Sequence, residues 1–159
     1  MRAVLAAASI LVLVGTAYAA ETAKHPEGHT TLTPQEIKRS PASASIPKGA
    51  EAAVLSGDPS KEGPFVLRLK FPANYHIAPH THPVPEAVTV LSGTFKIGDG
   101  ETADKAKTKT LPAGSFYTFS PGKAHFGYTE EETIIQLSTV GPWALTYVNP
   151  KDDPRQKTQ

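Results

Sequence analysis

The fold of this chain follows from residues 74–93, NYHIAPHTHPVPEAVTVLSG. His80 and His82 are two residues apart within it, so on a β-strand both imidazoles point to the same side of the sheet. Glu86 comes four residues after His82, beyond a bend between two prolines, and joins the imidazoles if the chain resumes the same face. Imidazoles and a carboxylate on one face are typical ligands of a divalent transition metal.

A third imidazole comes from a later turn. His125 follows the turn Ser-Pro-Gly and begins a short apolar run, so it reaches the first two histidines if the strands lie side by side. A lone histidine is usually a surface or hydrogen-bonded core residue, but these spacings together predict one metal site formed by His80, His82, Glu86 and His125. Such a site leaves one or two positions for water or substrate, and it admits Fe, Mn, Zn, Ni or Cu.

The rest of the chain has the pattern of an all-β domain. With 15 Pro and 12 Gly in 159 residues, it has too many turn residues for a helix bundle. Short apolar runs separated by turns predict strands at 52–55, 65–71, 87–91, 94–97, 108–111, 115–119, 125–128, 133–139 and 143–148. Regularly spaced short strands of this kind form a sandwich or a barrel.

Composition excludes several classes of protein. The absence of Cys rules out a disulfide framework, a zinc ribbon and a thiol nucleophile. The balance of 16 Lys+Arg against 15 Asp+Glu argues against a nucleic-acid binder or an anionic-membrane binder, because either needs an excess of basic side chains. We expect a small-molecule ligand as the partner of this chain.

The two ends of the chain lie outside this domain. Residues 1–19 read as a signal peptide, with Arg2, an apolar run, and Ala-Tyr-Ala before a cleavage site after Ala19. The alternative is a retained N-terminal anchor. We expect export, to a bacterial periplasm, and no membrane association after cleavage. An arm at 20–45 follows, with one helical turn at 33–38, then the barrel at 46–149 and a polar tail at 150–159.

The first motif resembles that of the cupins. The cupin pattern runs glycine, five residues, His-x-His, three or four residues, Glu, six residues, glycine. Here Asn74 stands at the opening glycine, and every spacing up to Gly93 fits. Asparagine also tolerates a left-handed backbone, so the turn is retained.

The second motif resembles the cupin pattern of glycine, five residues, Pro-x-Gly, two residues, His, three residues, Asn. Gly114 and His125 fit it, the proline has moved by one residue to Pro121, and Thr129 replaces the asparagine. Neither departure touches an expected ligand. The resemblance covers roughly residues 50–148.

The resemblance implies a jelly-roll barrel, the cupin double-stranded β-helix, that holds a metal through the four residues named above. It also implies a homodimer, because cupins commonly pair through exposed strand edges. We expect residues 46–55 or the arm at 20–45 to cross to the partner. Fold and ligand set do not fix a reaction, since cupins include dioxygenases, isomerases, decarboxylases and proteins that only bind or sense.

Strand parity predicts which side chains line the pocket. If Glu86 and His125 point inward, so do the residues at even spacing after them. We also expect Gln136 in the pocket, because it is the only polar residue in an apolar run. It must find a hydrogen-bonding partner, either a metal-bound water or a backbone group. The expected pocket residues are Val88, Val90, Gly127, Thr129 and Gln136. Gly127 leaves space for a substrate or dioxygen, or else marks a tight packing contact.

Three functions remain open. The first is a metal-dependent oxidoreductase of the dioxygenase-like kind, acting on a small molecule. The second is a non-enzymatic metal-binding or small-ligand-binding module, favoured by the lack of a second acid or histidine that could serve as a base. The third is a metal-dependent isomerase or lyase, which usually needs basic side chains inside the barrel. Arg68 and Lys70 are the only ones nearby, and both are expected on the outward face.

Overall fold

The computed structural model describes residues 28–156. The expected signal peptide at 1–19, the beginning of the arm and the last three residues of the tail lie outside the described residues. Within 28–156, no helix is long and apolar enough to cross a membrane.

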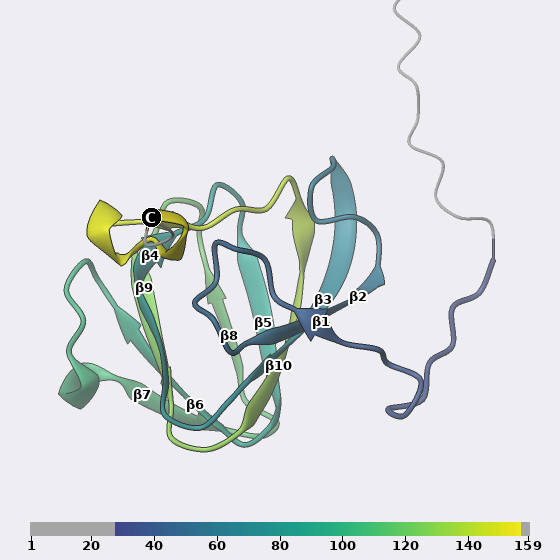
Figure 1. Cartoon of the computed structure of the whole chain (residues 1–159), viewed down its shortest axis with the longest axis horizontal. Coiled ribbons are helices and arrows are strands. Elements are labelled where there is room, and N and C mark those ends of the chain that lie inside the picture. The colour runs from purple at the N-terminus through teal and green to yellow at the C-terminus, as the bar shows by residue number, and fades with distance from the viewer. Residues whose placement is uncertain (1–27, 157–159) are drawn as a thin grey trace, which may run out of the picture.

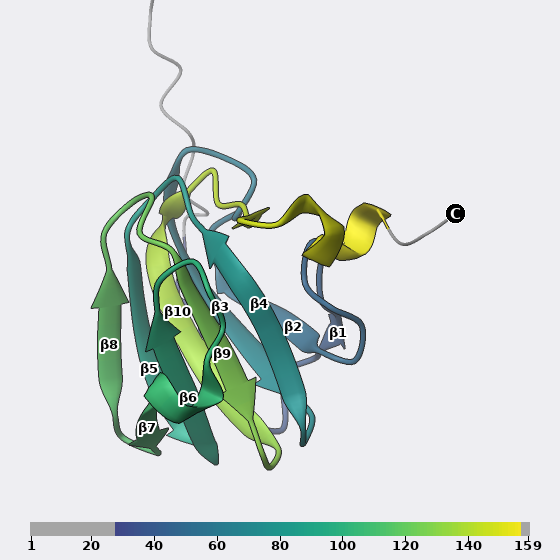
Figure 2. The ribbon, with the colours of Figure 1, turned by 90° about the vertical axis from the view of Figure 1, so that its left-hand side faces the viewer.

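The described strands form two antiparallel sheets that pack face to face (Figure 1). The six-stranded sheet has the order β1 (Ser40–Pro41), β2 (Glu51–Ser56), β3 (Gly63–Phe71), β10 (Thr133–Gly141), β5 (Glu86–Ser92) and β8 (Phe116–Phe119). The five-stranded sheet has the order β11 (Thr146–Tyr147), β4 (Tyr75–Thr81), β9 (His125–Thr129), β6 (Thr94–Asp99) and β7 (Lys109–Pro112). Figure 2 shows the second sheet in front of the first. The all-β jelly-roll arrangement predicted from the sequence is confirmed.

The strand predictions fail for β4 and for the run at 143–148. The strand β4 was not among the nine predicted runs, because the polar and proline residues within it interrupt its apolar pattern. The run expected at 143–148 is a strand only at Thr146–Tyr147, and the residues before it form a loop. The polar tail contains two short 3-10 turns, η2 (Pro150–Asp152) and η3 (Pro154–Gln156), and a third, η1 (Lys105–Lys107), lies between β6 and β7.

The described part of the N-terminal arm packs on the barrel of its own chain. Thr33 and Glu36 make half of a capping box: the Thr33 N–H donates to Glu36 Oε2 at 2.8 Å, whereas the Glu36 N–H donates to the backbone oxygen of Thr33 at 3.1 Å, as in a simple turn. These residues form a single turn, which does not extend into a helix. Further on, β1 pairs with β2, which pairs with β3 of the same chain. The homodimer and the crossing segment stay predictions.

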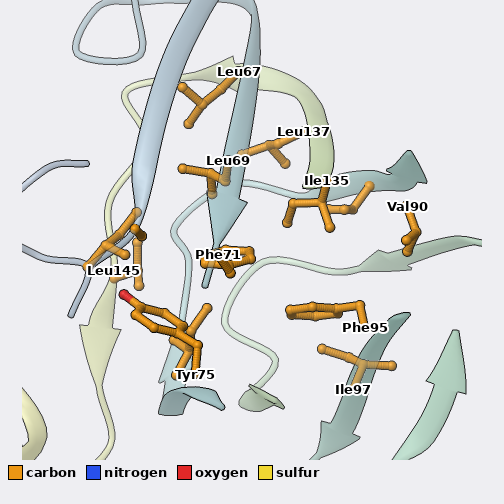
Figure 3. Close-up of a cluster of buried hydrophobic side chains, with 14 of the residues drawn as sticks. Leu67, Leu69, Phe71, Tyr75, Val90, Phe95, Ile97, Ile135, Leu137 and Leu145 are labelled. Atoms are coloured by element: carbon orange, nitrogen blue, oxygen red, sulfur yellow. The ribbon is translucent and has the colours of Figure 1, made fainter. Parts of the chain in front are cut away.

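Alternation along β3 fills the space between the sheets. Phe65, Leu67, Leu69 and Phe71 are all buried, as the period of two predicts. Figure 3 shows how side chains from both sheets converge there. The ring of Phe95 stacks on that of Phe71, with centroids 5.9 Å apart. This apolar core occupies one part of the barrel and leaves the remaining interior to the polar residues described next.

Candidate metal centre

Three imidazoles meet between the sheets. His80 lies on β4 and pairs in register with His125 on β9, and His82 comes just after the end of β4. They are 5%, 3% and 4% exposed, in that order. One nitrogen of each lies within 4.8 Å of the others, so the cluster can hold a metal ion.

The backbone fixes which nitrogen each ring presents. Each Nδ1 lies close to a carbonyl oxygen: His80 Nδ1 to Ala78 O at 2.8 Å, His82 Nδ1 to Ala144 O at 2.7 Å, and His125 Nδ1 to Lys123 O at 3.0 Å. A carbonyl oxygen can only accept a hydrogen bond, so each Nδ1 carries the hydrogen atom. In a neutral ring the lone pair is then on Nε2, which is how histidine ligands are oriented in metal sites.

Glu86 completes the cluster from the first position of β5. Its Oε1 lies 3.2 Å from His82 Nε2, and its Oε2 lies 3.2 Å from His125 Nε2. Both atoms of each contact are acceptors when the imidazoles are neutral and the carboxyl is ionised. Acceptors held this close in a buried place need a positive charge between them. The donor set therefore fits a divalent transition ion, with three nitrogens and a carboxylate.

Burial sets the charge state of these groups. It lowers the pKa of His80 to about 3, with further lowering from the neighbouring imidazoles, and it also lowers the pKa of His82. Burial acts to raise the pKa of Glu86, but its interaction with the imidazoles outweighs burial, and the net pKa lies below its usual value. At neutral pH, His80 and His82 are therefore uncharged beside an ionised carboxylate.

Two aromatic side chains hold the cluster in place. The indole N–H of Trp143 donates to Glu86 Oε1 at 3.2 Å, and its ring stacks on His82 with centroids 5.0 Å apart. The ring of Phe119 stacks on His125, with centroids 4.3 Å apart. No pattern in the sequence indicates that these residues belong to the site. A buried indole N–H always needs a partner, and that was the available signal for Trp143.

The cluster borders a small cavity between the sheets. The space open to the centre of a water molecule is about 40 Å³. Most of the wall is aliphatic or aromatic: Ile46, Leu69, Phe71, Ile77, Val88, Phe95, Ile97, Ile135, Leu137 and Leu145. Besides the four cluster residues, the polar side chains in the wall are Tyr117 and Trp143.

The pocket predicted by strand parity is partly wrong. Val88 borders the cavity, whereas Val90 is fully buried in the core beyond it. Thr129 points inward but lies at the far end of β9. Its hydroxyl donates to Pro72 O at 2.7 Å and accepts from the Tyr75 N–H at 3.3 Å, so it fastens the turn before β4. Parity gives the side of the sheet but not the depth along the strand.

Gln136 faces away from the cavity, which corrects the prediction that it lines the pocket. Its Oε1 accepts a hydrogen bond from Arg68 Nε at 2.9 Å, and the two residues are partners in the β3–β10 register. Its neighbours Ile135 and Leu137 border the cavity instead. The partner that a glutamine in an apolar run needs is thus a side chain on the outer face.

The space expected beside Gly127 is occupied. A Cβ atom added to Gly127 would lie 2.5 Å from Cζ of Phe95, which is too close for any real contact. Gly127 borders the cavity, but its missing side chain makes room for the Phe95 ring and not for a substrate. Of the two alternatives left open by the sequence, the structure therefore favours tight packing.

The sequence and the fold of this chain are both similar to those of known proteins. The sequence pattern of the family described as "Domain of unknown function (DUF4437)" matches residues 39–153, which is most of the chain. The chain belongs to the DUF4437 family. Its fold and its relatives place this DUF4437 protein in the cupin superfamily.

Three known proteins illustrate the range of similarity. Germin-like protein 5-1 of Oryza sativa subsp. japonica is 45% identical over 56 residues, which is 35% of the DUF4437 chain and 25% of that relative, so the chain spans a quarter of its length. The polyketide cyclase RemF from Streptomyces resistomycificus superposes with a TM-score of 0.67 at 16% identity, over 83% of this chain and 94% of that one. An oxalate oxidase gives a TM-score of 0.50 at 20% identity, over 69% and 60%. At these identities the solved structures show a shared fold.

Proposed function

We propose that the chain is a metal-dependent oxidoreductase of the dioxygenase-like kind. In this proposal one divalent transition ion is held by His80, His82, His125 and Glu86, and a small molecule binds in the cavity beside it. The observation that carries the proposal is the buried cluster of three imidazole nitrogens and a carboxylate, which borders a small, mainly apolar cavity.

The residues of the chain have separate tasks in this proposal. An iron, manganese or copper ion supplies Lewis acidity and one-electron chemistry, which the side chains of the cavity lack. The three backbone carbonyls keep each Nε2 aimed at the centre, and Trp143 holds the carboxylate of Glu86. The apolar wall limits the access of water to the reacting groups.

A non-enzymatic binding module is the second candidate. Among the described residues that line the cavity, Glu86 is the only acid, and every histidine belongs to the cluster. No separate general base is therefore available next to a bound molecule. An isomerase or lyase acting on an anionic substrate is less well supported, because no Lys or Arg is among these lining residues.

Metal analysis of the His125→Ala variant tests the centre itself. The intact protein should bind one divalent ion per chain and melt at a higher temperature when loaded, because the ion binds the folded state. Loss of a hydrogen-bonding partner of a ligand typically weakens metal binding about 10- to 100-fold, so loss of a ligand should cost at least as much. His76→Ala is the matched control, since His76 is exposed and stacks on Tyr128. Equal metal content in the two variants would contradict the assignment.

Oxygen uptake then separates the two candidates. Protein loaded in turn with Fe(II), Mn(II), Ni(II) and Cu(II) is offered catechols, flavonols, diketones and keto acids, and dioxygen consumption is recorded. Turnover with a redox-active ion that His125→Ala abolishes supports the oxidoreductase. A fully loaded protein that consumes no dioxygen with any of these compounds favours the binding module.

A further inference from the structure

The walls of the cavity indicate what kind of molecule it accepts. We propose that it takes a small, mainly apolar molecule that brings no more than one negative charge, and that the hydroxyl group of Tyr117 donates a hydrogen bond to this molecule. The inference rests on the metal centre proposed above and goes beyond it by naming the ligand class and a residue that recognises it.

Charge balance limits the ligand. A divalent ion with one carboxylate and neutral imidazoles carries a formal charge of +1. An uncharged ligand leaves that charge, a monoanion cancels it, and a dianion leaves a net negative charge in the barrel. An uncompensated buried charge is strongly unfavourable.

No basic side chain is positioned to compensate for a second negative charge. The described residues that line the cavity include no Lys or Arg. Three basic residues of the surrounding strands are engaged elsewhere: Arg68 Nε donates to Gln136, Lys70 Nζ lies 2.9 Å from an oxygen of Glu132, and Lys96 Nζ lies 2.9 Å from an oxygen of Glu130. The cavity therefore lacks the cations with which proteins usually bind dicarboxylates and phosphates.

The size and surface of the cavity favour a short apolar skeleton. The cavity is small, with about 40 Å³ open to the centre of a water molecule. The wall away from the cluster is formed by side chains such as Leu69, Ile97 and Ile135, which offer no hydrogen bond. A ligand there must present its polar atoms to the metal and its carbon atoms to the wall.

Tyr117 supplies the one free hydrogen-bonding group in that wall. It lies opposite Val88 in the β5–β8 register, so both side chains point into the barrel, and its ring stacks on Phe95 with centroids 5.9 Å apart. The other polar groups in the wall are already paired: the Trp143 N–H donates to Glu86, and each Nδ1 of the cluster donates to a carbonyl oxygen. The Tyr117 hydroxyl has no such partner among the described residues. Burial, with a contribution from Glu86, raises the pKa of Tyr117 well above its usual value, so the phenol keeps its proton and can donate.

Two molecules of the same shape test the charge limit. In 2,4-pentanedione and malonate, two oxygen atoms are separated by the same three-carbon unit, but methyl groups in the first replace charged oxygens in the second. Protein loaded with Ni(II), after one ion per chain has been verified, is titrated with each compound by calorimetry and by the absorption bands of the ion. The ratio of the affinity for pentanedione to the affinity for malonate should be at least tenfold higher for the Ni(II)-loaded protein than for Ni(II) in water. Malonate binding with an unshifted or reversed ratio, or no binding of pentanedione, would overturn the proposed ligand class.

Tyr117→Phe tests the hydrogen bond while keeping the ring and its stacking. It should weaken pentanedione binding about tenfold, the usual effect of one hydrogen bond to a ligand oxygen, with metal content and melting temperature unchanged. Tyr128→Phe is the matched control, because that ring stacks on the exposed His76 outside the barrel. Equal affinities of the two variants would remove Tyr117 from the proposal. A protein that binds no ion at all would instead contradict the metal centre, which distinguishes the two failures.

Discussion

At the scale of single residues, the role of Trp143 in the site depends on both its ring and its N–H group. Its ring covers His82 and its N–H holds one oxygen of Glu86, so one side chain orients two members of the cluster. Partners of this kind, one step removed from a metal, commonly decide how strongly the metal is bound.

Trp143→Phe separates the hydrogen bond from the stacking. Phenylalanine keeps an aromatic ring against His82 but leaves Glu86 Oε1 without its donor, so metal affinity should fall about 10- to 100-fold in competition with a chelator. Tyr75→Phe is the control. It removes the hydrogen bond from the Tyr75 hydroxyl to Pro47 O, which lies away from the cluster, and should lower stability without changing metal affinity. An unchanged affinity in Trp143→Phe would show that the indole only fills space.

At the scale of elements, β9 passes so close to Phe95 that it has room only for glycine at position 127. The Phe95 ring cannot move aside freely, because it is stacked between Phe71 and Tyr117 at 5.9 Å from each. Tight packing of this sort makes an added methyl group unfavourable.

Gly127→Ala should therefore destabilise the protein by about 1–3 kcal/mol, measured by urea unfolding. The new Cβ would meet Cζ of Phe95 at 2.5 Å, and Phe95→Leu in the same chain should recover part of the loss. If Gly127→Ala instead kept full stability and lost ligand binding, the missing side chain would leave space for a ligand, which is the other alternative that the sequence left open.

The elements also show what the sequence could reveal. The four residues of the cluster could be predicted because their spacing is local to two short motifs, and Asn74 does adopt the left-handed φ of 56° that the motif needs. Gln136 was misplaced because polarity was given more weight than the parity of its strand. The roles of Gly127 and Trp143 depend on Phe95 and Glu86, which come from distant parts of the chain. Such contacts form only when the two sheets pack together, so no local sequence pattern predicts them.

At the scale of the whole molecule, the buried imidazoles make the metal-free protein sensitive to acid. His80 has a pKa of about 3 when folded, against 6.5 for an ordinary histidine, so between these values the unfolded chain binds a proton that the folded chain does not. The contribution of His80 to the free energy of unfolding is therefore fully present above about pH 6.5. It falls as the pH drops toward 3, by up to about 1.4 kcal/mol per pH unit.

Urea unfolding of metal-free protein between pH 3 and pH 8 measures this loss. His80→Asn lacks the titrating ring and should show a shallower decline than the wild type over the same range. Parallel declines would mean that other groups cause the acid sensitivity. His76→Asn is the comparison variant: burial also lowers the pKa of His76, but not by as much as that of His80, so this substitution should change the slope less than His80→Asn does.

The pairing of early with late strands has a consequence for how the protein matures. The strand β3 lies between β2 and β10, and its last residue, Phe71, pairs with Thr133 of β10, so the six-stranded sheet cannot be finished until the end of the domain is in place. The carbonyl of Ala144 and the indole of Trp143, which orient His82 and Glu86, come later still. Chain-distant pairings form slowly because the intervening loop must first be closed. A chain that is still being synthesised therefore has no complete metal site. Imidazole and carboxylate ligands bind several divalent metals, so the local supply of each metal has more influence than the ligands on which one is bound. If the proposed metal centre is correct, the compartment in which the barrel finishes folding would decide which ion it holds.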